Sequence, residues 1–139
     1  MPGRIRTRET GADAEVGRQG SPRVTSVTGG ELAMATRPSE AGFSPLDLLF
    51  ASLAGCMVLS ARMAAARLGV ADRLGEVRAE VGGEKAKDEP ARIETFNVRL
   101  DIAGDLDAAT KQRILDDAEE ICTVSNTLRG APALHATLG

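Results

Sequence analysis

The stretch that decides the fold is SPLDLLFASLAGCMVLS, residues 44–60. Ser44 is a residue type that caps helix N-termini, and Pro45 suits the first helical position because its fixed φ is already helical. Asp47 follows three residues after Ser44 and places a carboxylate near the positive end of the helix dipole. The stretch therefore predicts that a long helix begins at Pro45.

The helix is expected to run to Leu68, with Gly69 as its stop. Its uncharged part, residues 48–61, is shorter than the roughly 18 residues that span a bilayer, which favours a core helix. Apolar and small residues cover most of its circumference, so it should be surrounded by protein. Spacings of three and four place on one face Leu46, Leu49, Phe50, Leu53, Cys56, Met57 and Ser60.

Length and composition favour one soluble globular domain, residues 1–139. The chain is 42% hydrophobic and 27% charged, which is typical of globular proteins rather than disordered or membrane proteins. The N-terminus carries basic residues but no apolar segment behind them, so no secretory signal is expected. We therefore expect a cytoplasmic protein with no membrane partner, whose thiols are reduced by default.

Several classes of function are excluded by absence. The net charge of -3, the scattered basic residues and the lack of Trp and Tyr argue against a nucleic-acid partner. His135 is the sole histidine and the two cysteines lie far apart, so no usual zinc spacing exists and no metal site is expected. There is likewise no dinucleotide, phosphate-loop or nucleophile-elbow motif.

The order of predicted elements indicates an α+β fold. Two half-buried strands with alternating side chains, residues 76–81 and 96–102, are expected to pair across an exposed connection at 82–92. A second helix should begin after Asp105 or Asp107 and place Ile114, Leu115, Ala118, Ile121 and Cys122 at helical spacing. Further short strands are expected at residues 4–10, 23–27 and 31–36, with a turn at Gly29-Gly30, and at 133–138.

The two cysteines allow two interpretations. Free cysteine is among the residue types most often buried, and it commonly does nothing but pack. Cys56 and Cys122, however, each lie on the apolar face of a predicted helix, so the two helices could bring the sulfurs together. The residues around them decide how the pair is best interpreted.

Both cysteine segments resemble the OsmC/Ohr family of hydroperoxide-reducing proteins. Residues 42–56, GFSPLDLLFASLAGC, are similar to that family's SP-x-(E/D)-LL-x-A-L-(A/G)-x-C segment. Residues 121–128, ICTVSNTL, resemble its Cys-Pro-Val-Ser/His-x-x-Leu segment, and the order of strands and helices matches along nearly the whole chain. The resemblance implies an OsmC-like fold, with antiparallel sheets packed around long central helices in an intertwined homodimer.

The resemblance also implies a chemistry. Cys56 matches the peroxidatic cysteine, which attacks an organic hydroperoxide and becomes a sulfenic acid, and Cys122 matches the resolving cysteine, which condenses with it to a disulfide. An external dithiol, such as a dihydrolipoyl group, would reduce the disulfide, and no cofactor is needed. The apolar residues expected to line the substrate pocket are Leu49, Phe50, Leu53 and Met57.

Such a cysteine must be a thiolate, yet burial raises the pKa of a thiol. Cys56 lies too deep in its helix for the dipole to help, so a cation is expected to offset burial. GRQG at residues 17–20 looks like the family's Gly-Arg-x-Gly turn, which makes Arg18 the candidate and Arg23 the reserve. Both could equally be solvated surface residues.

Two departures from the family bear on activity. Leu46 stands where the peroxidases carry a glutamate that pairs with the arginine, and Asp47 beside it is expected to cap the helix instead. Thr123 replaces a common proline. Two functions from different classes therefore stand: a thiol peroxidase acting on organic hydroperoxides, and a dimeric small-molecule-binding or stress-response protein that uses its thiols weakly or not at all.

Overall fold

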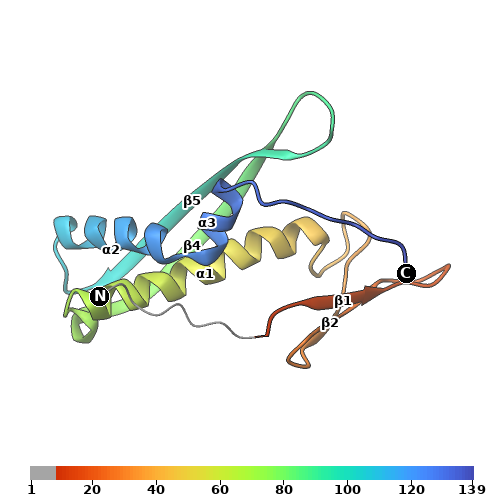
Figure 1. The fold of residues 1–139 in the computed structure, drawn as a ribbon. Helices are drawn as coiled ribbons and strands as arrows, with labels where there is room; N and C mark the ends of the chain where they lie inside the picture. The colour runs from red at the N-terminus through yellow and green to blue at the C-terminus, as the bar shows by residue number, and fades with distance from the viewer. Residues whose placement is uncertain (1–8) are drawn as a thin grey trace. The chain divides into compact units, whose positions relative to one another are not determined.

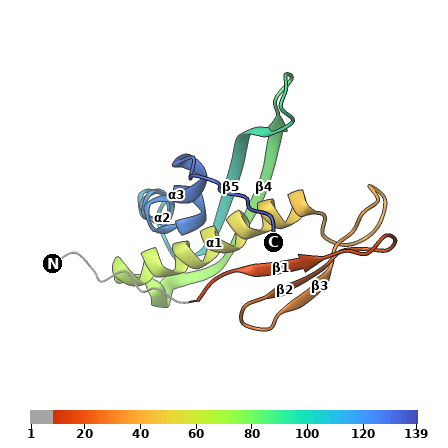
Figure 2. The same cartoon turned by 45° about the vertical axis from the view of Figure 1, so that its right-hand side comes forward.

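The computed structural model describes residues 9–139, and its Cα positions divide into two compact units. One unit ends at Leu48 and the other runs from Leu49 to Gly139 (Figures 1 and 2). That the two fold as a single domain stays a prediction.

The N-terminal unit holds an antiparallel sheet in the order β1-β2-β3. Its strands are β1 (Ala12–Glu15), β2 (Arg23–Ser26) and β3 (Glu31–Ala33). Two of the predicted strands are confirmed as β2 and β3, and so is the turn between them. Gly29 in this turn has a φ of 97°, a conformation that favours glycine. The strand expected at residues 4–10 is wrong at Glu9 and Thr10, which precede β1, and its remainder lies outside the described residues.

Helix α1 (Pro45–Arg67) begins as its sequence predicts. The Asp47 N–H donates to Ser44 Oγ at 3.1 Å, and the Ser44 N–H donates to Asp47 Oδ2 at 2.9 Å. These two hydrogen bonds form a capping box. The pKa of the Asp47 carboxyl is lowered by hydrogen bonds from the Ser44 N–H and, to a smaller extent, from the Ser44 hydroxyl. The helix ends one residue earlier than expected, just before Gly69, whose φ of 75° suits a residue without a side chain.

The long antiparallel hairpin of the C-terminal unit follows α1 and a short 3₁₀ turn, Ala71–Arg73. Its strands, β4 (Leu74–Lys85) and β5 (Ile93–Gly104), pair with Val81 opposite Val98. Both strands are longer than predicted, so the exposed connection is only 86–92 rather than 82–92. Gly83 permits the close approach of α1, because a Cβ there would lie 2.9 Å from the Phe50 ring.

Two further helices, α2 (Ala108–Ile121) and α3 (Thr123–Arg129), complete the unit. Asp107 caps α2 by accepting a 2.7 Å hydrogen bond from the Thr110 N–H. After α3, residues 131–139 form no strand, and Leu134 is 88% exposed, so the strand expected at 133–138 is wrong. A strand needs a neighbouring edge for its backbone groups, and this segment pairs with no strand of the described chain.

The core of the C-terminal unit forms where α1 and α2 meet the hairpin. Half-buried side chains of β4 and β5, among them Val77, Phe96 and Leu100, pack against it. Its buried residues are Leu53, Met57, Ala61, Ala64, Ala65, Val70, Ile114, Ala118 and Cys122. By length and composition alone α1 could cross a membrane, but core helices pass the same test, and its buried residues pack on the hairpin and α2.

Candidate active site

Cys56 lies in the middle of α1, half-buried, between the buried residues Leu53 and Ser60. Of the face that helical spacing predicted, Leu53, Met57 and Ser60 are buried, whereas Leu46 at its N-terminal end is 39% exposed. The Ser60 hydroxyl lies 4.0 Å from Cys56 Sγ, at the outer limit of a hydrogen bond to sulfur. Cys56 thus reaches both the packed core and its margin.

Cys122 occupies the break between α2 and α3 and is fully buried. Its N–H closes the last turn of α2 on the Ala118 carbonyl at 2.9 Å. Its ψ of 106° then turns the chain, and its sulfur accepts a 3.4 Å hydrogen bond from the Ser125 N–H at the start of α3. Cys122 was expected to point inward from within the second helix; it does point inward, but from the residue that follows α2.

The environment of Cys56 favours its thiolate. Burial by itself would raise the pKa of the Cys56 thiol, but hydrogen bonds outweigh it. They come, in order of effect, from the Cys122 thiol, the Val124 N–H, the Ser60 hydroxyl and the Thr123 N–H, and together they lower the pKa below that of an ordinary thiol. Hydrogen-bond donors within the C-terminal unit therefore stabilise the Cys56 thiolate, a role for which the sequence predicted a cation.

The environment of Cys122 has the opposite effect. Burial raises the pKa of the Cys122 thiol, and the neighbouring Cys56 raises it further, because Cys122 donates its proton to the Cys56 sulfur. The Ser125 N–H opposes this shift without reversing it. The structure thus brings together a thiolate-prone sulfur and a proton-bearing one, an arrangement suited to a nucleophile beside a thiol that can later condense with it.

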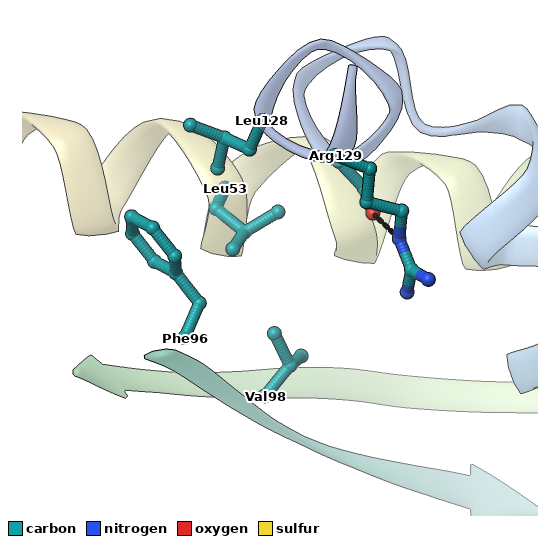
Figure 3. Close-up of a pocket in the computed structure, with 6 residues that line it drawn as sticks. Leu53, Phe96, Val98, Leu128 and Arg129 are labelled. Atoms are coloured by element: carbon teal, nitrogen blue, oxygen red, sulfur yellow. Dashed lines mark hydrogen bonds between the residues drawn. The ribbon is translucent and has the colours of Figure 1, made fainter. Parts of the chain in front are cut away.

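A pocket of about 210 Å³ has in its lining Leu53, three residues before Cys56, and Ser125, whose N–H donates to Cys122 Sγ (Figure 3). Its lining comes from α1, β5 and α3. Figure 3 shows Leu53 and Leu128 above the cavity, Phe96 and Val98 rising from β5, and Arg129 at one side. The lining residues are Leu53, Phe96, Val98, Ser125, Leu128 and Arg129.

Of the four pocket residues that the sequence predicts, Leu53 lines this cavity. Phe50 supports it from behind by packing edge-on against Phe96, with ring centroids 5.8 Å apart. Met57 is buried in the core, and Leu49 is half-buried without lining the cavity. Helical spacing shows which residues share a face, but it does not show which of them line a cavity and which pack against the core.

The polar candidates of the N-terminal unit have separate surroundings. Arg18 lies in the exposed turn before β2, and its role toward Cys56 stays a prediction. Arg23 pairs with Glu31 at 3.5 Å on the exposed sheet. The carboxylate of Asp47 is engaged in the capping box, as predicted. Among residues 9–139, no cluster of His, Cys, Asp and Glu could hold a metal ion.

Helix α3 is the functional element that the sequence reasoning missed. It supplies two N–H groups to Cys56 and three residues to the pocket. The sequence signal for this helix is short, since only Val124 and Leu128 stand four residues apart. In the structure Thr127 Oγ1 also donates to the Thr123 carbonyl at 2.7 Å. Seven residues are too few for periodicity to separate a helix from a loop.

A comparison with protein families gives a match over most of the chain. The sequence model of the family described as OsmC-like protein matches residues 38–136. No curated protein sequence matches the chain.

Solved structures share the fold at low sequence identity. An OsmC-like protein from Mycoplasma pneumoniae has a TM-score of 0.77 at 19% identity, covering 88% of this chain and 89% of its own. An organic hydroperoxide resistance protein OsmC from Legionella pneumophila, described as a predicted redox protein, has a TM-score of 0.73 at 21% identity, with 91% and 93% covered. The organic hydroperoxide resistance protein OhrB of Bacillus subtilis has a TM-score of 0.67 at 22% identity, with 88% and 92% covered.

Proposed function

The chain belongs to the OsmC-like protein family, and from this premise we propose that it is a thiol-dependent peroxidase that reduces organic hydroperoxides. The observation that carries the proposal is that Cys56 and Cys122 lie near enough to interact and that this interaction shifts their pKa values in opposite directions, with Cys56 half-buried and Cys122 buried. Packing alone gives no reason for such a difference between two neighbouring thiols. A peroxidase needs it, because one sulfur must attack while the other keeps its proton.

The first proposed step is attack of the Cys56 thiolate on the terminal oxygen of the hydroperoxide. The S–O bond forms as the O–O bond breaks, and the alkoxide that leaves takes up a proton and departs as an alcohol. Cys56 is thereby oxidised to a sulfenic acid, and the hydroperoxide is reduced.

Cys122 then attacks the Cys56 sulfenic sulfur, which forms a disulfide and releases water. The proximity of the two sulfurs in the resting structure supports this step. An external dithiol, such as a dihydrolipoyl group, would return both cysteines to thiols by exchange and become a disulfide itself. In this scheme the chain uses neither a metal nor a bound cofactor, and it acts in the reducing cytoplasm.

We also propose that the protein acts as a homodimer. Helix α1 leaves Leu59 52% exposed and Met63 47% exposed, one turn apart, and the described part of the N-terminal unit buries only Ala35. A second copy covering these surfaces would remove apolar area from water, which is the main source of association energy. Light scattering at micromolar concentration should give twice the chain mass.

The peroxidase proposal is tested by oxidising the reduced protein with a slight excess of cumene hydroperoxide. Mass spectrometry should show the loss of two hydrogens per subunit, from a Cys56–Cys122 disulfide, and a dithiol should restore the starting mass. The matched variants separate the two roles. Cys122→Ser should leave Cys56 as sulfenic acid, whereas Cys56→Ser should leave Cys122 unmodified. Two thiols that survive minutes of excess hydroperoxide in the wild-type protein would overturn the proposal.

A binding function is the second candidate, and one observation favours it. The N-terminal unit has its own pocket of about 380 Å³, larger than the cavity lined by Leu53 and Ser125, and its lining includes Pro22, Met34 and Pro45. A protein that uses this pocket alone would bind an apolar molecule without needing either cysteine. Binding of a fluorescent apolar probe that Met34→Glu abolishes, together with inert thiols, would support it.

A further inference from the structure

Helix α3 begins at the two thiols. Its first three N–H groups, at residues 123–125, cannot bond within the helix, and the first backbone bond comes from the Asn126 N–H, which donates to the Cys122 carbonyl at 3.0 Å. The Ser125 N–H donates to Cys122 Sγ at 3.4 Å. The other two lie close enough to Cys56 to lower the pKa of its thiol by hydrogen bonding. The two sulfurs therefore cap this helix together.

We propose that formation of the Cys56–Cys122 disulfide uncaps α3 and thereby loosens the wall of the cavity that α3 forms. The place of this change in turnover rests on the proposed peroxidase function, because the disulfide is the product of the second step. In that step the S–S bond forms, the S–O bond of the sulfenic acid breaks and water leaves.

Oxidation changes the cap of α3 in charge and in position. A thiolate is a charged acceptor, and charge-assisted hydrogen bonds are roughly twice as strong as neutral ones. A disulfide sulfur is neutral, and divalent sulfur is a weak acceptor. Bonding to Cys56 also moves Cys122 Sγ, which accepts from the Ser125 N–H while both thiols are reduced. Both changes remove stabilisation from the start of α3.

Helix α3 depends on this cap because few other contacts hold it. It has seven residues, and isolated helices of this length are marginal in water. Its apolar residues Val124 and Leu128 pack against the core cluster, but both are only partly buried. One exposed side-chain bond, from Asn126 Nδ2 to the Glu120 carbonyl at 3.0 Å, also ties it to α2. A short element of this kind opens locally at a low free energy.

Loosening α3 changes the cavity directly. Ser125, Leu128 and Arg129 of α3 supply half of the residues that line it (Figure 3). Cys122 is 0% exposed, so an external dithiol reaches its sulfur only when the surrounding chain moves. A loosened α3 therefore gives the dithiol access to the disulfide and gives the alcohol product a way out.

The test is amide hydrogen exchange, measured by NMR on the reduced protein and on the disulfide form. Diamide forms the disulfide by direct oxidation of the thiols, so the comparison does not depend on turnover of a hydroperoxide. In the disulfide form the α3 amides of Asn126 and Gly130 should exchange about fivefold faster, the effect of losing one helix cap. The α2 amides of Ile114 and Ala118 should keep their rates.

Two variants of Cys122 form a matched pair. Cys122→Ser keeps an acceptor at the cap but forms no disulfide, so its α3 amides should exchange as in the reduced wild type and should not respond to diamide. Cys122→Ala removes the acceptor without any oxidation, so its α3 amides should exchange about fivefold faster under reducing conditions.

Equal exchange of α3 in the reduced and disulfide forms of the wild type would overturn the inference alone. So would an equal rise in α2, because the whole unit would then have lost stability and α3 would not have been released locally. If the disulfide forms with diamide but not with cumene hydroperoxide, the proposed peroxidase function fails, and the exchange of α3 still decides whether the disulfide uncaps it. Absence of the disulfide even with diamide would overturn both.

Discussion

The two compact units of the chain differ in how much of their surface they bury. Among residues 9–48 only Ala35 is buried, and every residue of β1 and β3 is exposed. Residues 49–139 contain the whole buried cluster and both cysteines. The thiol pair thus lies in the unit that can hold side chains rigidly by packing, which is what a pre-organised reactive site requires.

The difference also separates two sources of thiolate stabilisation. The hydrogen bonds that lower the pKa of Cys56 all come from the C-terminal unit. The family-based candidate, Arg18, belongs to the N-terminal unit. A three-stranded sheet with so little buried surface gains stability only when something covers it, which accords with the proposed dimer.

The largest effect is expected at the exposed side of α1. Fully burying a leucine contributes about 1.5–3 kcal/mol, and Leu59 is 52% exposed, so the two copies of a symmetric dimer gain about that amount together. Leu59→Asp should remove this gain and add several kcal/mol for burying two carboxylates. Sedimentation or light scattering over a dilution series measures the shift. Gln112→Glu, which adds a charge to an exposed position on α2, should leave the dimer intact. Identical behaviour of the two variants would show that α1 is not an interface.

The next effect compares the cores of the two units. Ile114 is 0% exposed, so Ile114→Ala should lower the free energy of unfolding by about 2–5 kcal/mol through lost burial and the cavity left behind. Leu32 on β3 is 36% exposed, and Leu32→Ala should cost less than about 1 kcal/mol. Urea unfolding curves of the two variants measure this difference. If both variants lost the same unfolding free energy, the two units would not differ in how much their packing contributes to stability.

A third prediction concerns the reactivity of Cys56. Its thiolate should form as pH rises through a pKa lower than that of an ordinary thiol, so alkylation is fast at neutral pH. Ser60→Ala removes one donor, should move the profile to higher pH and should slow neutral alkylation by at most about tenfold, since the 4.0 Å contact is long. Ser60→Thr should restore the rate.

Arginine variants extend the same measurement to the N-terminal unit. Arg18→Ala should also raise the pKa of Cys56 if the proposed cation acts there, and Arg23→Ala, whose side chain pairs with Glu31, should do little. No change with Arg18→Ala but a clear shift with Ser60→Ala would assign thiolate stabilisation to the C-terminal unit alone.

Much of the fold could be predicted because its signals are local. The capping box of α1 is set by Ser44 and Asp47, three residues apart, and the alternation of β4 and β5 is visible in single strands. The family resemblance added the pairing of Cys56 with Cys122, which no local signal contains. The same local reasoning was wrong for residues 133–138, because a strand there requires a partner edge from elsewhere in the fold.

The parts of the site that could not be predicted depend on packing between elements. The break at Cys122 and the short α3 place the N–H groups of Thr123 and Val124 near Cys56, which is far from both in sequence. Without α3, a cation was the only visible way to offset burial. Arg129 was missed for the same reason, because its place in the cavity follows from α3.

The smallest effect is expected at the cap of α1, which lies in the N-terminal unit while most of the helix lies in the other. Ser44→Ala removes the hydroxyl that accepts from the Asp47 N–H and should cost about 1 kcal/mol of unfolding free energy. Its effect on the alkylation profile of Cys56 should be nil, because a helix terminus acts only within about one turn. A shifted profile would show that the cap and the thiol are coupled across the units.

The neighbouring carboxylate gives that last prediction a pH dependence. Hydrogen bonds from the Ser44 N–H and hydroxyl lower the pKa of Asp47, so the carboxylate stabilises the folded state above its unfolded pKa and loses this contribution as pH falls through the lowered value. Asp47→Asn should therefore reduce the free energy of unfolding at neutral pH, and the difference from wild type should shrink in acid. Thermal unfolding at several pH values measures it. If the stability difference between wild type and Asp47→Asn instead stays constant down to strong acid, the negative charge of Asp47 is not its source. The protonated carboxyl would then still stabilise the cap better than the amide, through its hydrogen-bond geometry.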